Sequence, residues 1–159
     1  FTRGGAQTRS YHFVGLQVAE ARVFASLPDG QPAESVNDVY KRLLAEDPRA
    51  ICAYVSDANF QDIGTPSDYL RTSLDLASVE GDRLHGARLQ LDSSAIVTRS
   101  AVWDDVTIGA GARLDNSIVC DGAIVPPGAE YTRCVILPND GRTPDERERA
   151  EHGLLLAPL

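Results

Sequence analysis

The chain has 159 residues, of which 43% are hydrophobic and 24% charged, and its formal net charge is −8. This length and composition fit one folded domain or two small ones and exclude a wholly disordered chain. The negative charge argues against a broad nucleic-acid-binding or anionic-membrane surface, because both require clustered lysine and arginine. No apolar run reaches the roughly 20 residues that a membrane-spanning helix needs.

The cysteines and the N-terminal residues indicate in which cellular compartment the protein is expected. The three cysteines, Cys52, Cys120 and Cys134, are scattered and match neither a disulfide framework nor a metal-binding spacing. We expect them to be small buried residues in a reducing cytoplasm. No signal peptide is visible, and the chain begins at Phe1 without a methionine, which leaves open a segment upstream.

The first part of the chain is predicted to alternate strands and helices. Residues Tyr11–Val18 are apolar and aromatic, which favours a buried strand, and Ala19–Leu27 carries apolar residues at helical spacing. A clearer helix is predicted to begin at Ser35 and to end at Pro48, and Ala50–Val55 reads as another strand.

A helix start is predicted at the end of this part. Thr65 is placed to cap the helix, Pro66 occupies its first position, and the carboxylate of Asp68 faces the positive end of the helix dipole. The helix is expected to run to about Val79. Residues 1–80 are therefore predicted to be an α/β layer, with too few strands for a complete sheet, so they look like the C-terminal part of a larger domain.

After a linker over residues 81–93, the spacing of apolar residues changes to a period of six. One series of positions holds Ile96, Val102, Ile108, Leu114 and Cys120. The position two residues earlier holds Ser94, Ser100, Val106, Ala112, Ile118 and Ile124. This period, with glycines at intervals, predicts a short left-handed β-helix of hexapeptide repeats over residues 94–137, with roughly two coils. The alternative is an antiparallel hairpin with its turn at Gly109–Gly111.

Two features of the repeats bear on function. Trp103 is expected to point outward, either as the anchor of an interface or packed on Leu154–Leu159. In the tail over residues 138–159, Asp140–His152 is expected to be a solvated tail or a short helix, and Leu154–Leu159 to dock back on the fold. Histidine is absent between Ser94 and Leu137, which argues against an acyltransferase with a histidine base on the repeats. The isolated His12, His85 and His152 show no metal-ligand spacing.

Three segments in this order resemble the sugar nucleotidyltransferase (NDP-sugar pyrophosphorylase) family. The three segments are Phe13–Val18, the motif Phe60–Leu70 with its Asp-Ile-Gly-Thr-Pro core, and the repeats that follow. Their order and spacing are similar to those of its mannose-1-phosphate guanylyltransferase-like members, which make GDP-mannose-like products, and of bacterial members that make UDP-sugars. The resemblance runs from about Tyr11 to Leu137 and aligns with only the C-terminal part of such enzymes. It implies a Rossmann-like α/β catalytic domain followed by a left-handed β-helix.

The resemblance also implies a chemistry. In the family, a sugar 1-phosphate attacks the α-phosphate of a nucleoside triphosphate and releases pyrophosphate, with Mg²⁺ held by two aspartates. Asp62 matches one of these aspartates; from the residue alone, it could instead bind loop amides near Thr65. Gly15 matches a glycine near the sugar, although Phe13 replaces the family's asparagine, and Gly15 could equally be a bulge or close-packing residue. No catalytic residue is assigned within this chain.

The N-terminal motifs of the family are absent from this chain. Gly4–Arg9 superficially resembles the phosphate-binding loop but lacks the strand before it and the Pro-Leu-Thr after it, and the Glu-Lys-Pro motif is also missing. We therefore expect the C-terminal portion of a cytoplasmic, homo-oligomeric enzyme that is inactive alone. The alternatives are a non-catalytic regulatory or oligomerisation module and a degenerate subunit that binds sugar phosphates.

Overall fold

The structure is a computed structural model that describes residues 11–81 and 84–159. The chain divides into two compact units, Phe1–Phe60 and Gln61–Leu159. The segment Gly4–Arg9, whose sequence superficially resembles the phosphate-binding loop of the family, lies outside the described residues.

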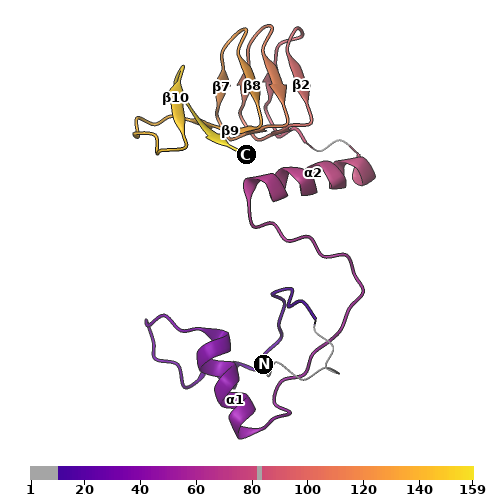
Figure 1. The fold of residues 1–159 in the computed structure, drawn as a ribbon, viewed down its shortest axis with the longest axis vertical. Helices are drawn as coiled ribbons and strands as arrows, with labels where there is room; N and C mark the ends of the chain where they lie inside the picture. Colours follow the sequence, from indigo (N-terminus) through magenta and orange to yellow (C-terminus); the bar gives the residue numbers. More distant parts are fainter. Residues whose placement is uncertain (1–10, 82–83) are drawn as a thin grey trace. The chain divides into compact units, whose positions relative to one another are not determined.

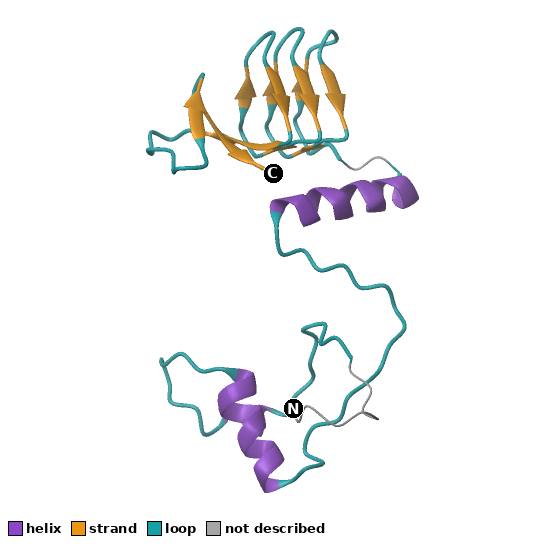
Figure 2. Cartoon of the chain, in the orientation of Figure 1, coloured by secondary structure: helices purple, strands orange, loops and turns teal. Residues whose placement is uncertain are grey.

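The first unit contains short helices joined by irregular segments (Figure 2). A 3₁₀ turn, η1, spans Ala21–Phe24, and a π-helical turn, η2 (Ser35–Tyr40), leads directly into α1 (Lys41–Glu46). Val39 is the buried residue of η2. The helix predicted to begin at Ser35 and to end before Pro48 is thus confirmed.

The predicted strands of the first unit are wrong. No strand is formed between residues 11 and 81, so the expected α/β layer over residues 1–80 is not present in the described part of the chain. The apolar segments Tyr11–Val18 and Ala50–Val55 have no partner strand, and Val18 and Tyr54 are 100% and 94% exposed. A strand needs a neighbour to satisfy its backbone and to cover its side chains, which strand-forming residue types cannot supply alone.

Helix α2 (Pro66–Glu80) forms where the sequence predicted a helix, but it belongs to the second unit, whereas the sequence placed it at the end of the α/β layer over residues 1–80. The hydroxyl oxygen of Thr65 accepts a hydrogen bond from the amide of Asp68 at 3.1 Å and donates to the Asp68 carboxylate at 2.8 Å. This reciprocal capping and the proline at the first helical position fix where the helix begins. No helix in the described ranges is long and apolar enough to cross a membrane.

The rest of the second unit is formed by short strands in three sheets (Figure 1). The first sheet contains β1 (Gln90–Leu91), β4 (Thr107–Ile108) and β7 (Ile124–Val125), and the second contains β2 (Ile96–Thr98), β5 (Arg113–Asp115) and β8 (Glu130–Thr132). The third contains β3 (Ala101–Val102), β6 (Ile118–Val119) and β9 (Cys134–Pro138), extended by β11 (Leu154–Pro158) and β10 (Arg149–Glu151).

The strands β1–β9 follow a 17-residue repeat, and we call them together the repeat stack. Gln90 pairs in parallel with Thr107, and Thr107 with Ile124, so each repeat contributes one strand to the first sheet. The same shift relates the strands of the second and third sheets. The chain therefore visits the three sheets in turn, and the antiparallel hairpin at Gly109–Gly111 is not formed.

Stacked side chains fill the interior of the repeat stack, one from each repeat in every column. Buried members of these columns are Val102, Val119 and Ile136; Val106 and Ala123; Ile108 and Val125; and Leu114 with Tyr131. Several positions that the six-residue count placed inside lie elsewhere: Ser94 is exposed, and Ile118 belongs to the outward cluster around Leu70. Ile96 and Ile124 are also exposed, and Cys120 packs outward in the same cluster as Ile118.

The turns between strands explain this shift. Four residues separate β1 from β2 and β3 from β4, whereas two residues separate β2 from β3. One turn in three is therefore shorter, and a count by six falls out of register once in every repeat. The short turn contains a left-handed residue at Arg99 (φ +46°) and again, one repeat later, at Asn116 (φ +50°).

Buried serines continue the interior at the short turn. The Ser117 amide donates to the Ser100 hydroxyl at 3.0 Å, while the hydroxyls of Ser100 and Ser117 donate to the carbonyls of Thr98 and Asp115. The Cys134 amide in turn donates to the Ser117 hydroxyl at 3.4 Å. Small hydroxyl side chains thus satisfy backbone groups that the tight turn leaves without a strand partner.

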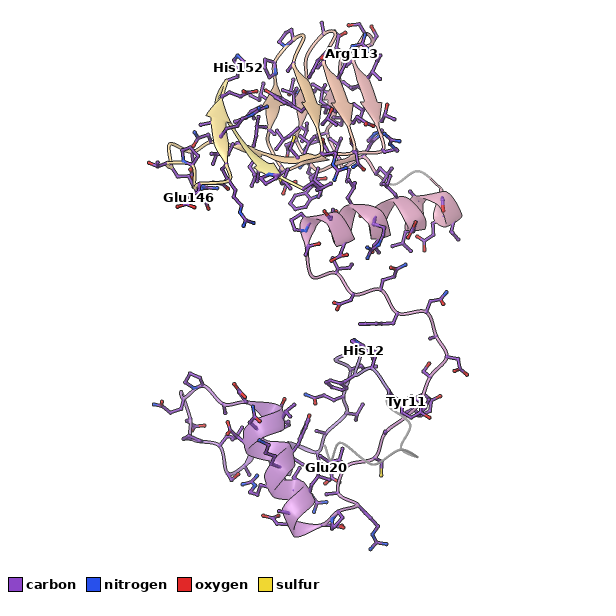
Figure 3. The ribbon with its side chains drawn as sticks, viewed as in Figure 1. Tyr11, His12, Glu20, Arg113, Glu146 and His152 are labelled. Carbon is purple, nitrogen blue, oxygen red and sulfur yellow. The ribbon has the colours of Figure 1, made fainter. Side chains whose placement is uncertain are left out.

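The end of the chain is part of the fold, where the sequence predicted a solvated tail. Strand β11 pairs antiparallel with both β9 and β10. Leu154 and Leu156 join the core of the repeat stack, and His152 lies in the turn between β10 and β11 (Figure 3). The expected docking of Leu154–Leu159 therefore occurs as strand pairing.

Helix α2 covers the outward side of the third sheet (Figure 1). Its Leu70 is 2% exposed and packs against Ala101, Ile118 and Cys120. Burial of one leucine side chain contributes about 1.5–3 kcal/mol. The face formed by Leu70, Tyr69 and Leu74 thus attaches the helix to the stack.

The register of the stack predicts unequal effects of two identical substitutions. Ile136→Ala removes a side chain with 0% exposure and should lower the free energy of unfolding by about 2–5 kcal/mol. Ile124→Ala, at a 65% exposed residue, should change it by less than about 0.5 kcal/mol. Urea unfolding followed by the fluorescence of Trp103, the single tryptophan, measures both. Equal losses would contradict the register of the repeat stack.

Candidate functional site

Trp103 lies where the repeat stack meets helix α2. Its indole Nε1–H donates a hydrogen bond to the Tyr69 hydroxyl at 3.0 Å, and the two rings are edge to face with centroids 5.9 Å apart. The indole remains 37% exposed. The sequence analysis offered an interface or the tail as its partner, and the structure adds a third partner on α2. The bond fixes the orientation of a partly exposed aromatic ring.

The residues that follow Trp103 form an aspartate ladder at one turn. The Asp104 carboxylate accepts a hydrogen bond from the Ala87 amide at 2.8 Å, and the Asp121 carboxylate accepts one from the Asp104 amide at 2.9 Å. Each aspartate therefore uses one oxygen to hold the preceding repeat. This is a structural role that leaves carboxylate charge at the surface.

Arg88 is the cation of this turn. Its guanidinium binds the Asp105 carboxylate through two hydrogen bonds of 2.5 and 2.6 Å, and lies 3.9 Å from the nearer oxygen of Asp104. The hydrogen bonds and charge of Asp105, with smaller contributions from Asp104 and Asp121, raise the pKa of Arg88 above its ordinary value. One guanidinium thus lies among three carboxylates.

A pocket of about 290 Å³ opens between α2 and these turns, and we call it the corner pocket. Its aromatic and polar side chains are Tyr69, Ser73, His85, Trp103, Asp104 and Asp121. Gly86 lines it as well, and a β-carbon there would lie 2.4 Å from the backbone of Trp103. Only glycine lets the chain pass this close to the tryptophan.

Asp62, the residue matched to a metal-binding aspartate, is exposed at the start of the second unit. Its carboxylate makes no hydrogen bond or ion pair with any described residue, and it is Asp68 that interacts with Thr65. The alternative that Asp62 satisfies amides near Thr65 is therefore wrong. A free, exposed carboxylate suits a hard cation such as Mg²⁺.

The described residues do not form a metal site by themselves. No group of three or more histidine, cysteine, aspartate or glutamate side chains within residues 11–81 and 84–159 is arranged to hold a metal ion. Asp62 can supply one ligand, and the others would come from outside these residues. The role assigned to Asp62 stays a prediction.

Gly15 lies in the first unit, in an exposed, irregular segment, with φ +81°. This left-handed conformation favours glycine. A β-carbon there would meet no described atom within 4 Å, so Gly15 is neither a close-packing residue nor part of a strand bulge. Gly15 and Asp62 belong to different units, and the proposed contact of Gly15 with a sugar stays a prediction.

The isolated histidines and the thiols offer no catalytic arrangement among the described residues. His12 packs against Phe60, with ring centroids 5.3 Å apart, within the first unit. Burial raises the pKa of the Cys120 thiol to about 11, with a smaller effect of the Asp121 charge. A thiol with such a pKa is protonated and a poor nucleophile at neutral pH.

The corner pocket does not follow from a six-residue count along the sequence, because the repeat has 17 residues. Asp104 and Asp121 occupy the same position in successive repeats, and a count by the true repeat length would have stacked them. The contribution of Tyr69 could not be read from the repeats, because it comes from the helix that precedes them.

Comparison with known proteins gives one informative similarity. No family model matches the chain, and no solved structure matches it. The chain is 30% identical over 132 residues to the mannose-1-phosphate guanylyltransferase of Mycobacterium tuberculosis (strain ATCC 25618 / H37Rv). The match covers 75% of this chain, which spans 36% of the length of that relative. This supports a sugar nucleotidyltransferase-like family.

The hydrogen bond between Trp103 and Tyr69 can be tested with a single-atom change. Tyr69→Phe removes the acceptor oxygen and should lower the free energy of unfolding by about 0.5–1 kcal/mol, because the bond is partly exposed. It should also shift the fluorescence emission of Trp103. Tyr54→Phe, at an exposed tyrosine of the first unit, is the control and should change neither. An unchanged emission in Tyr69→Phe would show that the bond does not persist in solution.

Proposed function

We propose that this chain is the C-terminal portion of a nucleotidyltransferase that makes an NDP-sugar from a sugar 1-phosphate and a nucleoside triphosphate, with release of pyrophosphate. The similarity to a mannose-1-phosphate guanylyltransferase carries the proposal. That relative's name points to mannose 1-phosphate and a guanine nucleotide as first substrates to test. Cys120 is buried as expected, whereas the expected burial of Cys52 is wrong, because Cys52 is exposed. Free cysteines are compatible with the reducing cytoplasm that we propose as the location of the protein.

The exposed apolar segments of the first unit support the proposal that the chain is part of a longer protein. Its two apolar segments, Tyr11–Val18 and Ala50–Val55, carry strand-forming side chains that are exposed in this chain. In the parent we propose that residues 1–80 belong to a Rossmann-like α/β domain, whose sheet would pair these segments. We propose that the chain alone is inactive, because it lacks the N-terminal nucleotide-binding motif of the family.

The second unit supports the other half of the proposed architecture. We propose that the repeat stack is a left-handed β-helix, which the sequence predicted over residues 94–137. Strand β1 (Gln90–Leu91) pairs with β4, so the stack begins within residues 81–93, which were expected to be a linker. The parallel pairing of β1–β9 in three sheets, with a constant shift from one repeat to the next, supports this proposal.

In the reaction, this chain would contribute positioning and charge. Asp62 would hold Mg²⁺ together with ligands from outside the chain, and the bound ion would neutralise phosphate charge. Gly15 would let the backbone approach the sugar. In-line phosphoryl transfer depends mainly on such positioning and charge neutralisation, so it needs no protein nucleophile.

A non-catalytic regulatory or oligomerisation module is the alternative. The open edges of the three sheets favour it, because unpaired strand edges and flat faces invite symmetric association. A homo-oligomer is compatible with both functions, so activity and assembly must be measured separately.

The metal role of Asp62 predicts a loss of activity in the full-length protein. Asp62→Ala should abolish Mg²⁺-dependent release of pyrophosphate from a nucleoside triphosphate and a sugar 1-phosphate, because it removes a ligand of the ion. Asp57→Ala, at a nearby exposed aspartate, should retain activity. The chain alone, with its 159 residues, should release none. Activity of Asp62→Ala within a few-fold of wild type would refute the metal role.

The proposed self-association predicts a mass above that of one chain. Light scattering of the isolated chain should give a multiple of 17.1 kDa. If Trp103 anchors the interface, Trp103→Ala should reduce the mass, whereas Tyr69→Phe, which keeps the indole, should not. A monomeric chain would contradict self-association, and an unchanged mass in Trp103→Ala would contradict the role of Trp103.

A further inference from the structure

We propose that the corner pocket binds a small organic cation, through an ammonium or guanidinium group seated between Trp103 and the carboxylates of Asp104 and Asp121. The pocket lies wholly within the second unit, and its lining contains neither Asp62 nor Gly15, to which the proposed reaction assigns roles. The inference therefore stands independently of the proposed reaction.

The charge around the pocket selects a cation. Asp104 and Asp121 line it, and each uses one carboxylate oxygen for a backbone amide. The second oxygen of Asp121 has no hydrogen-bond partner among the described residues. Arg88 binds Asp105 and also lies 3.9 Å from Asp104, so the described aspartate and arginine charges of this turn are three carboxylates and one guanidinium. An arriving cation would therefore gain the second oxygen of Asp121 as a charge-assisted partner, and the charge of Asp104 would add to the attraction.

The aromatic side chains favour an organic cation. Trp103 and Tyr69 both line the pocket, and the hydrogen bond between them holds the indole in place before a ligand arrives. A cation near the face of tryptophan is stabilised by about 0.5–1 kcal/mol at exposed sites, and more where water is excluded. Because the ring is already fixed, binding costs little side-chain entropy.

The volume of the pocket and the side chains that line it limit which ligands can bind there. A volume of about 290 Å³ is at the lower end of the range for ligand pockets, so it suits one amine or guanidine group with a short chain. A divalent metal is a poor fit, since no three metal-ligating side chains within the described residues are grouped to hold one. A neutral sugar would leave the carboxylate charge uncompensated.

The same cationic group can come from a free amine or from a lysine or arginine of a protein. A test can separate the two sources, because Trp103 is the single tryptophan and reports directly on the pocket. The isolated chain is titrated with putrescine, with argininamide and with a blocked Gly-Arg-Gly peptide while Trp103 emission is recorded. We expect a saturable change with a dissociation constant of about 1 mM for at least one probe. Binding of the peptide alone would assign the cation to a protein side chain, and binding of putrescine or argininamide to a free amine.

Charge-neutral variants supply the decisive comparison. Asp104→Asn combined with Asp121→Asn keeps an amide oxygen for each backbone hydrogen bond and should weaken binding about tenfold. The control variant, Asp92→Asn combined with Asp115→Asn, removes the same charge from carboxylates that do not line the pocket. It should weaken binding of the cation by less than about twofold. If the double variant does not fold, Asp121→Asn alone replaces it in the comparison, and its affinity for the cation should fall about two- to fivefold.

Three outcomes would overturn the proposal. The first is no saturable change with any of the three cations up to ~10 mM. The second is equal weakening in the pocket and control variants, which would indicate attraction by the net charge of −8 alone. The third is the same saturable change with Mg²⁺ or with mannose, which would show that the site does not select an organic cation.

Discussion

Backbone pairing between successive repeats, with a shift that stays constant from strand to strand, is the interaction on which the second unit depends. The amide of Thr107 donates to the carbonyl of Ala123 and that of Ala101 to Ser117, so each repeat satisfies the backbone of the previous one. Because the shift is constant, each inward side chain meets its counterpart in the next repeat. The column of Val102, Val119 and Ile136 is the result. A slip by one residue would turn these side chains outward and leave the buried serines without their backbone partners.

The outward features follow from the same register. Ala101 and Ile118 lie side by side on neighbouring strands and together form the small apolar surface on which Leu70 of α2 packs. Just beyond these strands, the equal spacing stacks Asp104 above Asp121 and brings Trp103 to Tyr69. The corner pocket is therefore a product of the repeat and of the helix in front of it. The two could not vary independently without losing that geometry.

What could be predicted from the sequence depends on where the relevant partners lie. The cap at Thr65 and the start of α2 were predictable, because a helix start is set by residues within one turn of it. The repeated inward positions were partly predictable, but a count by six placed Ile124 and Cys120 inside, because the shortened turn at Arg99 and Asn116 has no strong residue signature. The strands expected at Tyr11–Val18 and Ala50–Val55 failed because pairing is not a property of the segment. The corner pocket joins residues 34 positions apart, Tyr69 and Trp103, which no local pattern relates.

The hairpin of β10 and β11 covers one end of the repeat stack in the third sheet. In the third sheet, a fourth repeat would place its parallel strand beside β9, and β11 already occupies that edge in the opposite orientation. Duplication of one repeat after β9 would therefore have to displace Leu154 and Leu156 from the core. Lengthening by evolution or by design is consequently restricted to insertions ahead of β9, where a whole repeat can enter without displacing β11 from β9. A second molecule is likewise prevented from continuing this sheet in parallel at that edge.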